Sequence, residues 1–507
     1  MIELDGNSLT IEKVFRIAAE GEKVTVSQEA MKRVKASRDI VEQIIDENRV
    51  VYGITTGFGH LCNTRIERKD LERLQTNLIR SHATGVGEPY PKDAVRAAIT
   101  VRINSLLHGV SGVRPEMVDA LVALLNSGIT PLVPQQGSVG CSGDLAPLSH
   151  IMLVLMGEGE VLGEDGHSRL PAMPELEKAG LKPIMLQAKE GLALINGTAV
   201  MAGVTALALY RAMHISKSAD IIATMTLEMS KGSTKPFDPE FIALRPYPGM
   251  AQVAQNVLAC IEDSEIRESH KGCSKVQDAY SLRCIPQVHG ATRENLNHLV
   301  DQLTIEINSV TDNPIILSKD KVISGGHFHG QPIAYVADFL GIIMSELADI
   351  SERRIDRLLN PLINEMKPFL TVDPGVNSGL MIVQYTAAAL VSENKVLAHP
   401  ASVDSIPTSA YQEDHVSMGS IASRKVGKII EHTAQVLAIE WLSASQAYEF
   451  LRPMKMGKGT NAAYELLRQY VPALKEDRIL APDMRIAKDL LWNDKLFNHV
   501  GQYVKLV

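Results

Sequence analysis

A short uncharged turn contains the residues whose chemistry most needs explaining. Residues 139–150 read Val-Gly-Cys-Ser-Gly-Asp-Leu-Ala-Pro-Leu-Ser-His, so Ser142 stands between a cysteine and a glycine. A serine in such a turn first indicates the nucleophile of a hydrolase. The hydrolase pattern G-x-S-x-G requires glycine two residues after the serine, however, and this chain has Asp144 there. The turn formed by Cys141, Ser142 and Gly143 therefore predicts some other chemistry.

Three more segments carry groups that could bind a ligand or move a proton. Tyr52 lies in Val-Tyr-Gly-Ile-Thr-Thr-Gly-Phe-Gly-His, residues 51–60, although its glycines are equally typical of a surface turn. Tyr280 and Arg283 are three residues apart and could share a helical face, although a structural arginine would have the same spacing. Residues 412–418, Gln-Glu-Asp-His-Val-Ser-Met, gather three ionisable groups and are also typical of a solvated helix start.

A pair of histidines raises the question of a metal. His327 and His329 are two residues apart in Ser-Gly-Gly-His-Phe-His-Gly-Gln, residues 324–331. A metal site needs further ligands on a rigid backbone, and neither an H-E-x-x-H motif nor a Cys/His companion accompanies the pair. We expect no metal cofactor.

The hydrophobic periodicity predicts a helical scaffold for these groups. From Pro332, apolar residues recur four and three apart as far as Ile350, and Asn360-Pro361 ends the pattern. Strand patterns are scarce, and the best is the short Lys321-Val-Ile-Ser. The predicted fold class is all-α, a bundle of long antiparallel helices. Similar helical patterns cover residues 198–230, 292–310 and 420–452. Catalytic loops are expected at helix ends, at residues 52–60, 139–147, 195–198 and 324–331.

The composition of the 507 residues bounds the class of protein. Hydrophobic residues make up 45% and charged residues 22%, as in a globular protein with a large core. The net charge is −8 with scattered basic residues, so we expect no nucleic-acid partner. The acidic start, Met-Ile-Glu-Leu-Asp-Gly, lacks the apolar stretch of a secretory signal, which predicts a cytoplasmic protein. Long helices leave side surfaces that one chain cannot cover, which predicts an oligomer.

The cysteines and the most apolar run lead to two further expectations. Residues 191–210 are uncharged, but Asn196-Gly197-Thr198 interrupts them, so we expect a buried core helix and no membrane span. The odd number of cysteines and the lack of a C-x-x-C pair predict free thiols. The cysteines are Cys62, Cys141, Cys260, Cys273 and Cys284.

Six motifs, in a fixed order over most of the chain, carry a resemblance to a known family. They are Tyr-Gly-Ile-Thr-Thr-Gly-Phe-Gly at 52–59, Cys-Ser-Gly-Asp-Leu-Ala-Pro-Leu at 141–148, Asn-Gly-Thr at 196–198, Gln-Asp-Ala-Tyr-Ser-Leu-Arg at 277–283, Thr-Asp-Asn-Pro at 311–314 and Gln-Glu-Asp-His-Val-Ser-Met at 412–418. Together they resemble the aromatic amino acid ammonia-lyases, most closely the members that act on L-histidine. The resemblance implies one domain over residues 1–507, with a loop-rich part at 1–200 and a long-helix part at 201–507, and a homotetramer.

The resemblance also gives the turn a chemistry. In this family the tripeptide, usually Ala-Ser-Gly, cyclises to 4-methylidene-imidazole-5-one (MIO) when the glycine nitrogen attacks the first residue's carbonyl carbon and two waters leave. Here MIO would form from Cys141, Ser142 and Gly143. A glycine-rich turn suits this reaction, because glycine leaves the attacking nitrogen unhindered. Only the backbone carbonyl of Cys141 takes part, so its side chain need not block the cyclisation.

The family roles can be carried over to the matching residues. The resemblance implies that Tyr52 is the general base and that Arg283 holds the substrate carboxylate in a bidentate pair. Tyr280 and Asn196 would support MIO and the departing amine. Gln277 and Phe328 would line the substrate pocket.

Two residues of the resemblance bear on the substrate. In the family, a histidine followed by alanine at one position, here His82, and a glutamate at another, here Glu413, accompany an imidazole substrate. A carboxylate in a closed pocket needs a donor, and the substrate imidazole N–H is one. The resemblance therefore implies that the substrate is the small amino acid L-histidine and the product trans-urocanate.

Some residues depart from the family pattern, and other functions stay open. Thr55, His327 and Tyr411 stand where asparagine is usual. Ala279 and Ile285 replace residues that are common in the members that act on L-histidine. His327 and Tyr411 could reshape the pocket for another aromatic amino acid. The alternatives are a tyrosine or phenylalanine ammonia-lyase, an aminomutase of the same family, and a catalytically silent helical homologue.

Overall fold

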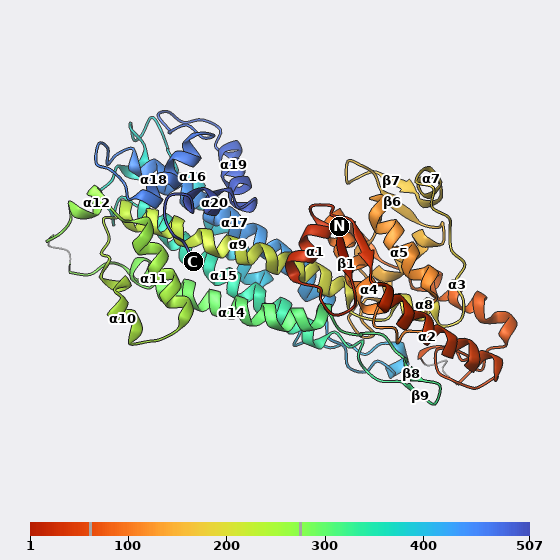
Figure 1. Cartoon of the computed structure of the whole chain (residues 1–507). Coiled ribbons are helices and arrows are strands. Elements are labelled where there is room, and N and C mark those ends of the chain that lie inside the picture. Colours follow the sequence, from red (N-terminus) through yellow and green to blue (C-terminus); the bar gives the residue numbers. More distant parts are fainter. Residues whose placement is uncertain (60–62, 273–275) are drawn as a thin grey trace. The chain divides into compact units, whose positions relative to one another are not determined.

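The computed structural model of the chain describes residues 1–59, 63–272 and 276–507. The chain forms two compact units, which we describe separately. Unit 1 consists of Met1–Tyr210, Val300–Phe339 and Pro400–Gly427, and unit 2 of Arg211–Leu299, Leu340–His399 and Lys428–Val507. Helices dominate both, and strands are few and short, so the predicted all-α class is confirmed (Figure 1).

Four long helices contribute residues to both units. They are α9 (Ala199–Met229), α14 (Ile285–Ile307), α15 (Gln331–Leu359) and α17 (Gly419–Tyr448). Each coincides with a helix predicted from apolar periodicity. α15 ends directly before Asn360-Pro361, as expected. α14 begins seven residues earlier than the predicted start at Thr292. Its Pro286 lies in the first turn, where a helix tolerates proline, so this residue does not prevent the earlier start.

Unit 1 consists of short helices and strands around the ends of the long helices. Its helices are α1 (Ile11–Ala18), α2 (Gln28–Asp46), α3 (Leu71–His82), α4 (Lys92–Leu106), α5 (Pro115–Ser127), α6 (Leu145–Leu155), α7 (Ala172–Lys178) and α8 (Glu190–Ile195). Helix α3 packs on α6 and α8, and α4 packs on α1 and α5. Local signals define the ends: Thr10 caps α1 by accepting from the Lys13 N–H, and α5 begins with Pro115 and ends at the left-handed Gly128.

The strands form four small sheets in unit 1. They are β1 (Ile2–Leu4), β2 (Val24–Val26), β3 (Val86–Pro89), β4 (Thr130–Pro131), β5 (Pro134–Gln136), β6 (Glu160–Leu162), β7 (Arg169–Pro171), β8 (Ile315–Ser318) and β9 (Lys321–Ile323). β1 pairs with β2 in parallel, Ile2 opposite Val24, and the other pairs, β3 with β5, β4 with β6, β6 with β7 and β8 with β9, are antiparallel. β9 coincides with the predicted strand.

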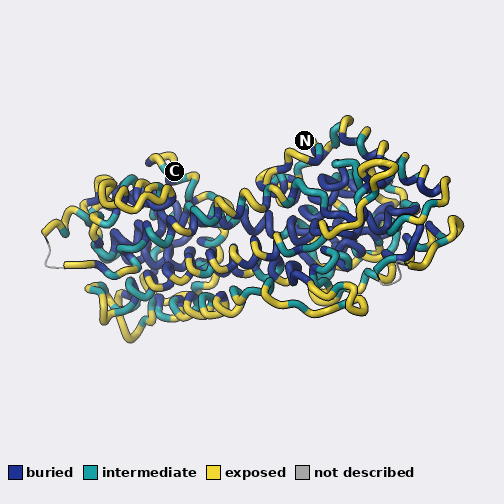
Figure 2. The backbone as a smooth tube through the Cα atoms, turned by 90° about the horizontal axis from the view of Figure 1, so that it is seen from below, coloured by how far each residue is buried: buried dark blue, intermediate teal, exposed yellow. Residues whose placement is uncertain are grey.

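Unit 2 is a helical bundle with a buried apolar core. Its shorter helices are α10 (Pro239–Ala243), α11 (Pro248–Cys260), α12 (Glu265–Glu268), α13 (Tyr280–Arg283), α16 (Met381–Leu397), α18 (Lys458–Arg468), α19 (Ala481–Trp492) and α20 (Lys495–Val500). In Figure 2 the buried residues, in dark blue, lie along the inner stretches of the helices, and the exposed residues, in yellow, lie at the outside. Buried polar groups join the long helices: Glu440 on α17 accepts from Thr226 on α9 at 2.7 Å and from Arg354 on α15 at 2.6 Å. A charge so buried requires such partners.

The most apolar helix is a core element. Within the described residues, α9 alone is long and apolar enough to cross a membrane by length and composition, and 67% of its most apolar window is buried inside the protein. That burial is typical of a core helix, as the sequence predicts. Cys141, Cys260 and Cys284 are free thiols, also as predicted, and Cys62 and Cys273 lie outside the described residues.

Candidate functional site

The turn at residues 141–143 lies against residues 196–198 in unit 1. Gly143 and Gly197 form an isolated parallel bridge. The Gly197 N–H donates to the carbonyl oxygen of Ser142 at 3.1 Å, and the Asp144 N–H donates to that of Gly197 at 2.8 Å. Gly143 has φ +79°, and a Cβ on it would lie 2.1 Å from the Gly197 oxygen. Both its conformation and its contact therefore require glycine.

Serine hydroxyls fix both ends of the turn. Ser138 Oγ donates to the carbonyl oxygen of Gly143 at 3.0 Å, and Ser417 Oγ donates to that of Gly140 at 3.0 Å. Gly140 is left-handed at φ +72°, and a Cβ there would lie 2.3 Å from Ser417 Oγ. The turn is thus held from both sides and has little freedom to extend.

Asp144 directly follows the turn and anchors it to α9. Its buried Oδ2 accepts from the N–H groups of Val200 and Met201, in the first turn of that helix, at 2.8 and 3.0 Å. Burial is the largest influence on its pKa and raises it to about 7, while the two backbone hydrogen bonds act in the opposite direction. The sequence does not indicate this role, because Asp144 directly precedes α6 while its side chain accepts from α9.

Glu413 accepts hydrogen bonds from the turn itself. Ser142 Oγ donates to its Oε1 at 3.0 Å, and Thr408 Oγ1 donates to its Oε2 at 2.7 Å. The Cys141 thiol also hydrogen-bonds to Glu413. Burial first, and then the charge of Glu413, raise the pKa of that thiol to about 12, so it stays protonated and unreactive at neutral pH. In the uncyclised chain, protein hydroxyls therefore donate hydrogen bonds to the Glu413 carboxylate, for which the resemblance implies a hydrogen-bond donor on the substrate.

A strained turn presents Glu413. Ser409, Ala410 and Tyr411 have φ values of 51°, 53° and 65°. The left-handed conformation costs a non-glycine residue about 1–2 kcal/mol. Thr408 and Glu413 close the turn with two backbone hydrogen bonds of 2.9 and 3.3 Å. Strain of this kind clusters at functional sites, where the surrounding structure has to enforce it.

His82 and Tyr52 also belong to unit 1. His82 is the last residue of α3, and its Nδ1 lies 2.9 Å from the carbonyl oxygen of Leu78. Burial lowers the pKa of His82, and the hydrogen bond to Leu78 and the charge of Glu413 partly offset this, so the ring is neutral at physiological pH. The Gly59 N–H donates to the hydroxyl oxygen of Tyr52 at 3.5 Å.

Asn196 stands beside the turn with an unused acceptor. Its buried Oδ1 has no hydrogen-bond partner among the residues that the structure describes. Arg102 on α4 is fully buried and fixes the backbone there: Nη1 donates to the carbonyl oxygen of Asn196 at 2.8 Å, and Nη2 donates to that of Ala193. Arg102 belongs to no motif, so the sequence could not indicate this role. Phe328 is half-buried between β9 and α15.

The other three predicted site residues lie in unit 2. The Arg283 guanidinium carbon lies 4.8 Å from the ring centroid of Tyr280, so these side chains share a face of α13, as their spacing predicts. Tyr280 is 72% exposed, and Gln277 is exposed as well. The buried Nε of Arg283 has no hydrogen-bond partner in the described part of the chain.

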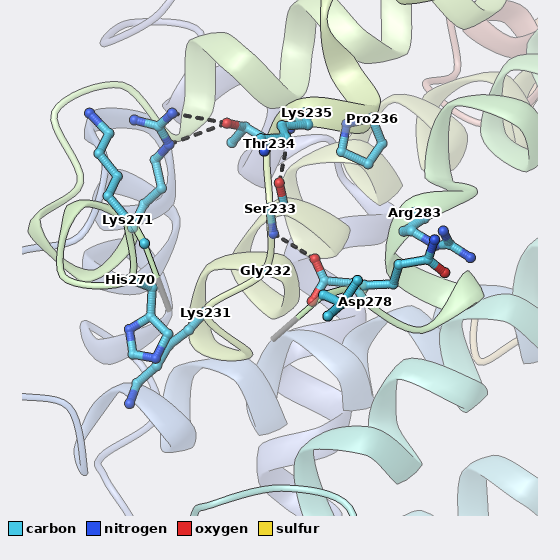
Figure 3. Close-up of a pocket in the computed structure, with 14 residues that line it drawn as sticks. Lys231, Gly232, Ser233, Thr234, Lys235, Pro236, His270, Lys271, Asp278 and Arg283 are labelled. Carbon is cyan, nitrogen blue, oxygen red and sulfur yellow. Dashed lines mark hydrogen bonds between the residues drawn. The ribbon is translucent and has the colours of Figure 1, made fainter. Parts of the chain in front are cut away.

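A cavity of about 530 Å³ opens beside Arg283 (Figure 3). One wall is ordered by Asp278, whose Oδ2 accepts from the Ser233 N–H at 2.6 Å. Cationic side chains prevail in the lining, which suits an anionic group such as a carboxylate. They are Lys231, Lys235, Arg267, Lys271 and Arg283, against the single carboxylate of Asp278.

The geometry fits the cyclisation that the resemblance implies. Residue 143 has no side chain beside its attacking nitrogen, and the turn is held closed. The buried Asn196 Oδ1, which has no hydrogen-bond partner in the described residues, lies on the adjoining segment.

As far as the structure describes the chain, His327 and His329 do not gather metal ligands. The rings of His329 and His415 stack with centroids 5.6 Å apart. Across residues 1–59, 63–272 and 276–507, no group of three or more His, Cys, Asp or Glu side chains is placed to hold a metal ion.

Comparisons with known proteins show the family of the chain. A histidine ammonia-lyase of Alkaliphilus metalliredigens is 49% identical, over 100% of this chain and 99% of the relative. The crystal structure of histidine ammonia-lyase from Trypanosoma cruzi matches with a TM-score of 0.92 and 41% identity, over 99% of this chain and 95% of that one. A tyrosine aminomutase from Streptomyces globisporus matches with a TM-score of 0.93 and 37% identity, over 100% and 99%. The family model described as aromatic amino acid lyase matches residues 9–469, and the chain belongs to that family.

Proposed function

We propose that this protein is an ammonia-lyase that converts L-histidine to trans-urocanate and ammonia with MIO formed from Cys141, Ser142 and Gly143. The observation that carries the proposal is the closed turn, in which Gly143 packs on Gly197 and the Ser142 hydroxyl meets Glu413. Identity near one half to histidine ammonia-lyases over the whole chain supports the substrate. MIO supplies an electrophile for the substrate amine that no ordinary side chain offers.

The residues of the chain would do the remaining work. Arg283 would bind the substrate carboxylate through its fork of N–H donors, and the cationic cavity beside it supports this role. Holding the carboxylate fixes the β-carbon in front of the base, Tyr52, whose phenol would accept the β-proton. Asn196, with its unused Oδ1, and Tyr280 would hold the leaving amine, while Gln277 and Phe328 would line the pocket.

Glu413 and His82 would select the imidazole ring. The Ser142 hydroxyl that donates to Glu413 is lost when the tripeptide cyclises, so the substrate N–H would take its place as a donor. Burial keeps His82 neutral, and because its Nδ1–H donates to the Leu78 carbonyl oxygen, its Nε2 is left to accept one hydrogen bond. A site built for such polar groups disfavours a phenyl ring, because its buried partners would then be unpaired.

The proposal includes a homotetramer in which each active site uses loops of more than one subunit. Exposed apolar side chains on one face of α15 support an oligomer: Tyr335 is 58%, Phe339 39% and Ile342 43% exposed. The high exposure of Tyr280 is consistent with contact to another copy. Free thiols at Cys141 and Cys260 suit the reducing cytoplasm, where we place the enzyme.

A substrate comparison tests the function. Purified protein should produce urocanate absorbance from L-histidine much faster than it deaminates L-tyrosine or L-phenylalanine. Equal rates on all three would remove the histidine assignment. Formation of a β-amino acid would instead indicate an aminomutase, and no reaction together with an unprocessed tripeptide would indicate a silent homologue.

A further inference from the structure

The carboxylate of Glu413 touches the hydroxyl that the chain must lose to mature. Ser142 Oγ lies 3.0 Å from Glu413 Oε1 in the unprocessed turn. That hydroxyl leaves as water when the tripeptide is processed, so a contact with it serves a step before any substrate arrives. The contact brings together residues 271 positions apart in the sequence.

Glu413 is also held in place more firmly than a substrate contact alone would require. Thr408 Oγ1 donates to its Oε2 at 2.7 Å, and the backbones of the same two residues are paired. The three left-handed residues Ser409, Ala410 and Tyr411 form the turn between them. A group that transfers protons has to be positioned within hydrogen-bond reach of the reacting atom, and this framework achieves that.

We propose that Glu413 is the acid-base group that removes the second water from Ser142 during self-processing, with Thr408 as its positioning residue. This inference rests on the proposed function, because it assumes that the tripeptide cyclises. It assigns Glu413 a role in the chain's own maturation, in addition to its role toward substrate.

The step balances without any co-reactant. The proton leaves Cα of residue 142, and the electron pair of that C–H bond becomes the second bond between Cα and Cβ. The Cβ–Oγ bond breaks, and its electron pair leaves with the oxygen. Glu413 accepts the Cα proton and returns a proton to Oγ, so that water departs and the carboxylate is regenerated.

The variants Glu413→Gln and Asp414→Asn form a matched pair for the test. Each variant removes one carboxylate, and the two residues are adjacent in the sequence. Asp414 is exposed. Each full-length protein is made by cell-free synthesis, and the mass of the peptide that contains residues 141–143 is followed with time. Wild type and Asp414→Asn should reach a deficit of two waters. Glu413→Gln should stay at one water or none, reaching two about 10²-fold or more slowly, the usual size of acid-base assistance.

A second pair covers the case in which Glu413→Gln fails to fold, as judged by circular dichroism. Thr408→Ser keeps the hydroxyl that positions Glu413, and Thr408→Val removes it at nearly the same volume. Processing should be much slower in Thr408→Val than in Thr408→Ser. Equal rates in that pair, or a wild-type rate in Glu413→Gln, would overturn the inference. Wild-type protein of full mass would instead overturn the MIO formation on which the inference rests.

Discussion

Gly143 and Gly197 face each other so closely that a Cβ on residue 143 would lie 2.1 Å from the Gly197 carbonyl oxygen. The same two glycines are joined as a parallel bridge, flanked by hydrogen bonds from the Gly197 and Asp144 N–H groups. The segment after α8 thus acts as a template for the turn. Its closed shape is fixed before any covalent change, which lowers the entropic cost of bringing residues 141 and 143 into contact.

The substitution Glu413→Gln should lower histidine turnover by orders of magnitude, because the partner of the substrate imidazole is lost. Activity has to be expressed per processed molecule, since the same variant is expected to mature slowly. Mass spectrometry gives that fraction, and urocanate absorbance gives the rate. Turnover per processed molecule within a few-fold of wild type would show that Glu413 lies outside the substrate pocket.

Replacement of His82 by leucine should shift the enzyme away from histidine. The leucine side chain cannot hydrogen-bond an imidazole, so we expect kcat/KM for L-histidine to fall about ten-fold or more. The ratio of L-phenylalanine to L-histidine turnover should rise. His167→Leu, at an exposed loop of the same unit, is the control. An unchanged ratio in His82→Leu would contradict the proposed selectivity.

The burial of Asp144 should make stability depend on pH. Its pKa is raised from 3.8 to about 7 in the folded protein, so between these values the folded state binds the proton and the unfolded chain releases it. Unfolding then releases protons, and this contribution to the free energy of unfolding falls as pH rises toward 7. Asp144→Asn can still accept from α9 and does not titrate.

Melting temperatures across this pH interval test the effect. Asp144→Asn should lose less stability than wild type as pH rises, and the exposed Asp414→Asn should follow wild type. Parallel curves for all three proteins would show that Asp144 has the same proton affinity in the folded and unfolded chain.

Chelators should have no large direct effect on turnover. The proposed reaction uses a group formed from the chain and needs no metal, so dialysis against a chelator should leave the rate of urocanate formation unchanged. Complete loss of activity that only zinc restores would revive a metal site at His327 and His329.

The scaffold could be predicted from the sequence because apolar periodicity and proline positions act locally. The start signal at Pro332 and the stop signal at Asn360-Pro361 place α15 to within one residue at each end. The spacing of Tyr280 and Arg283 likewise predicts their contact. These features depend on helix geometry alone and therefore need no knowledge of the remaining fold.

The residues that hold the site residues in place could not be predicted in this way. Thr408 meets Glu413 across three left-handed residues, none of them glycine, so local propensity favours a different turn. Arg102 reaches Asn196 across 94 positions of sequence. Such contacts depend on how distant segments pack, and the sequence signals for them are single residues without a pattern.

The turn at residues 141–143 gives the most direct prediction. If the tripeptide cyclises, the intact mass must fall short of the sequence mass by two waters, and the peptide containing these residues must carry the whole deficit. Ser142→Ala should abolish both the deficit and the activity, because it lacks the hydroxyl that leaves. Cys141→Ala should keep both, because only the backbone carbonyl of residue 141 reacts, and the protonated thiol contributes one hydrogen bond to Glu413.

Three outcomes of the mass measurement lead to different conclusions. Full mass with lyase activity would mean that another electrophile operates, so the mechanism would be wrong although the reaction is right. Full mass without activity would favour a silent homologue, and recovery of the deficit in Cys141→Ala would then identify the cysteine as the obstacle. A two-water deficit with activity on L-histidine would mean that Cys141 is tolerated because its side chain stays outside the ring.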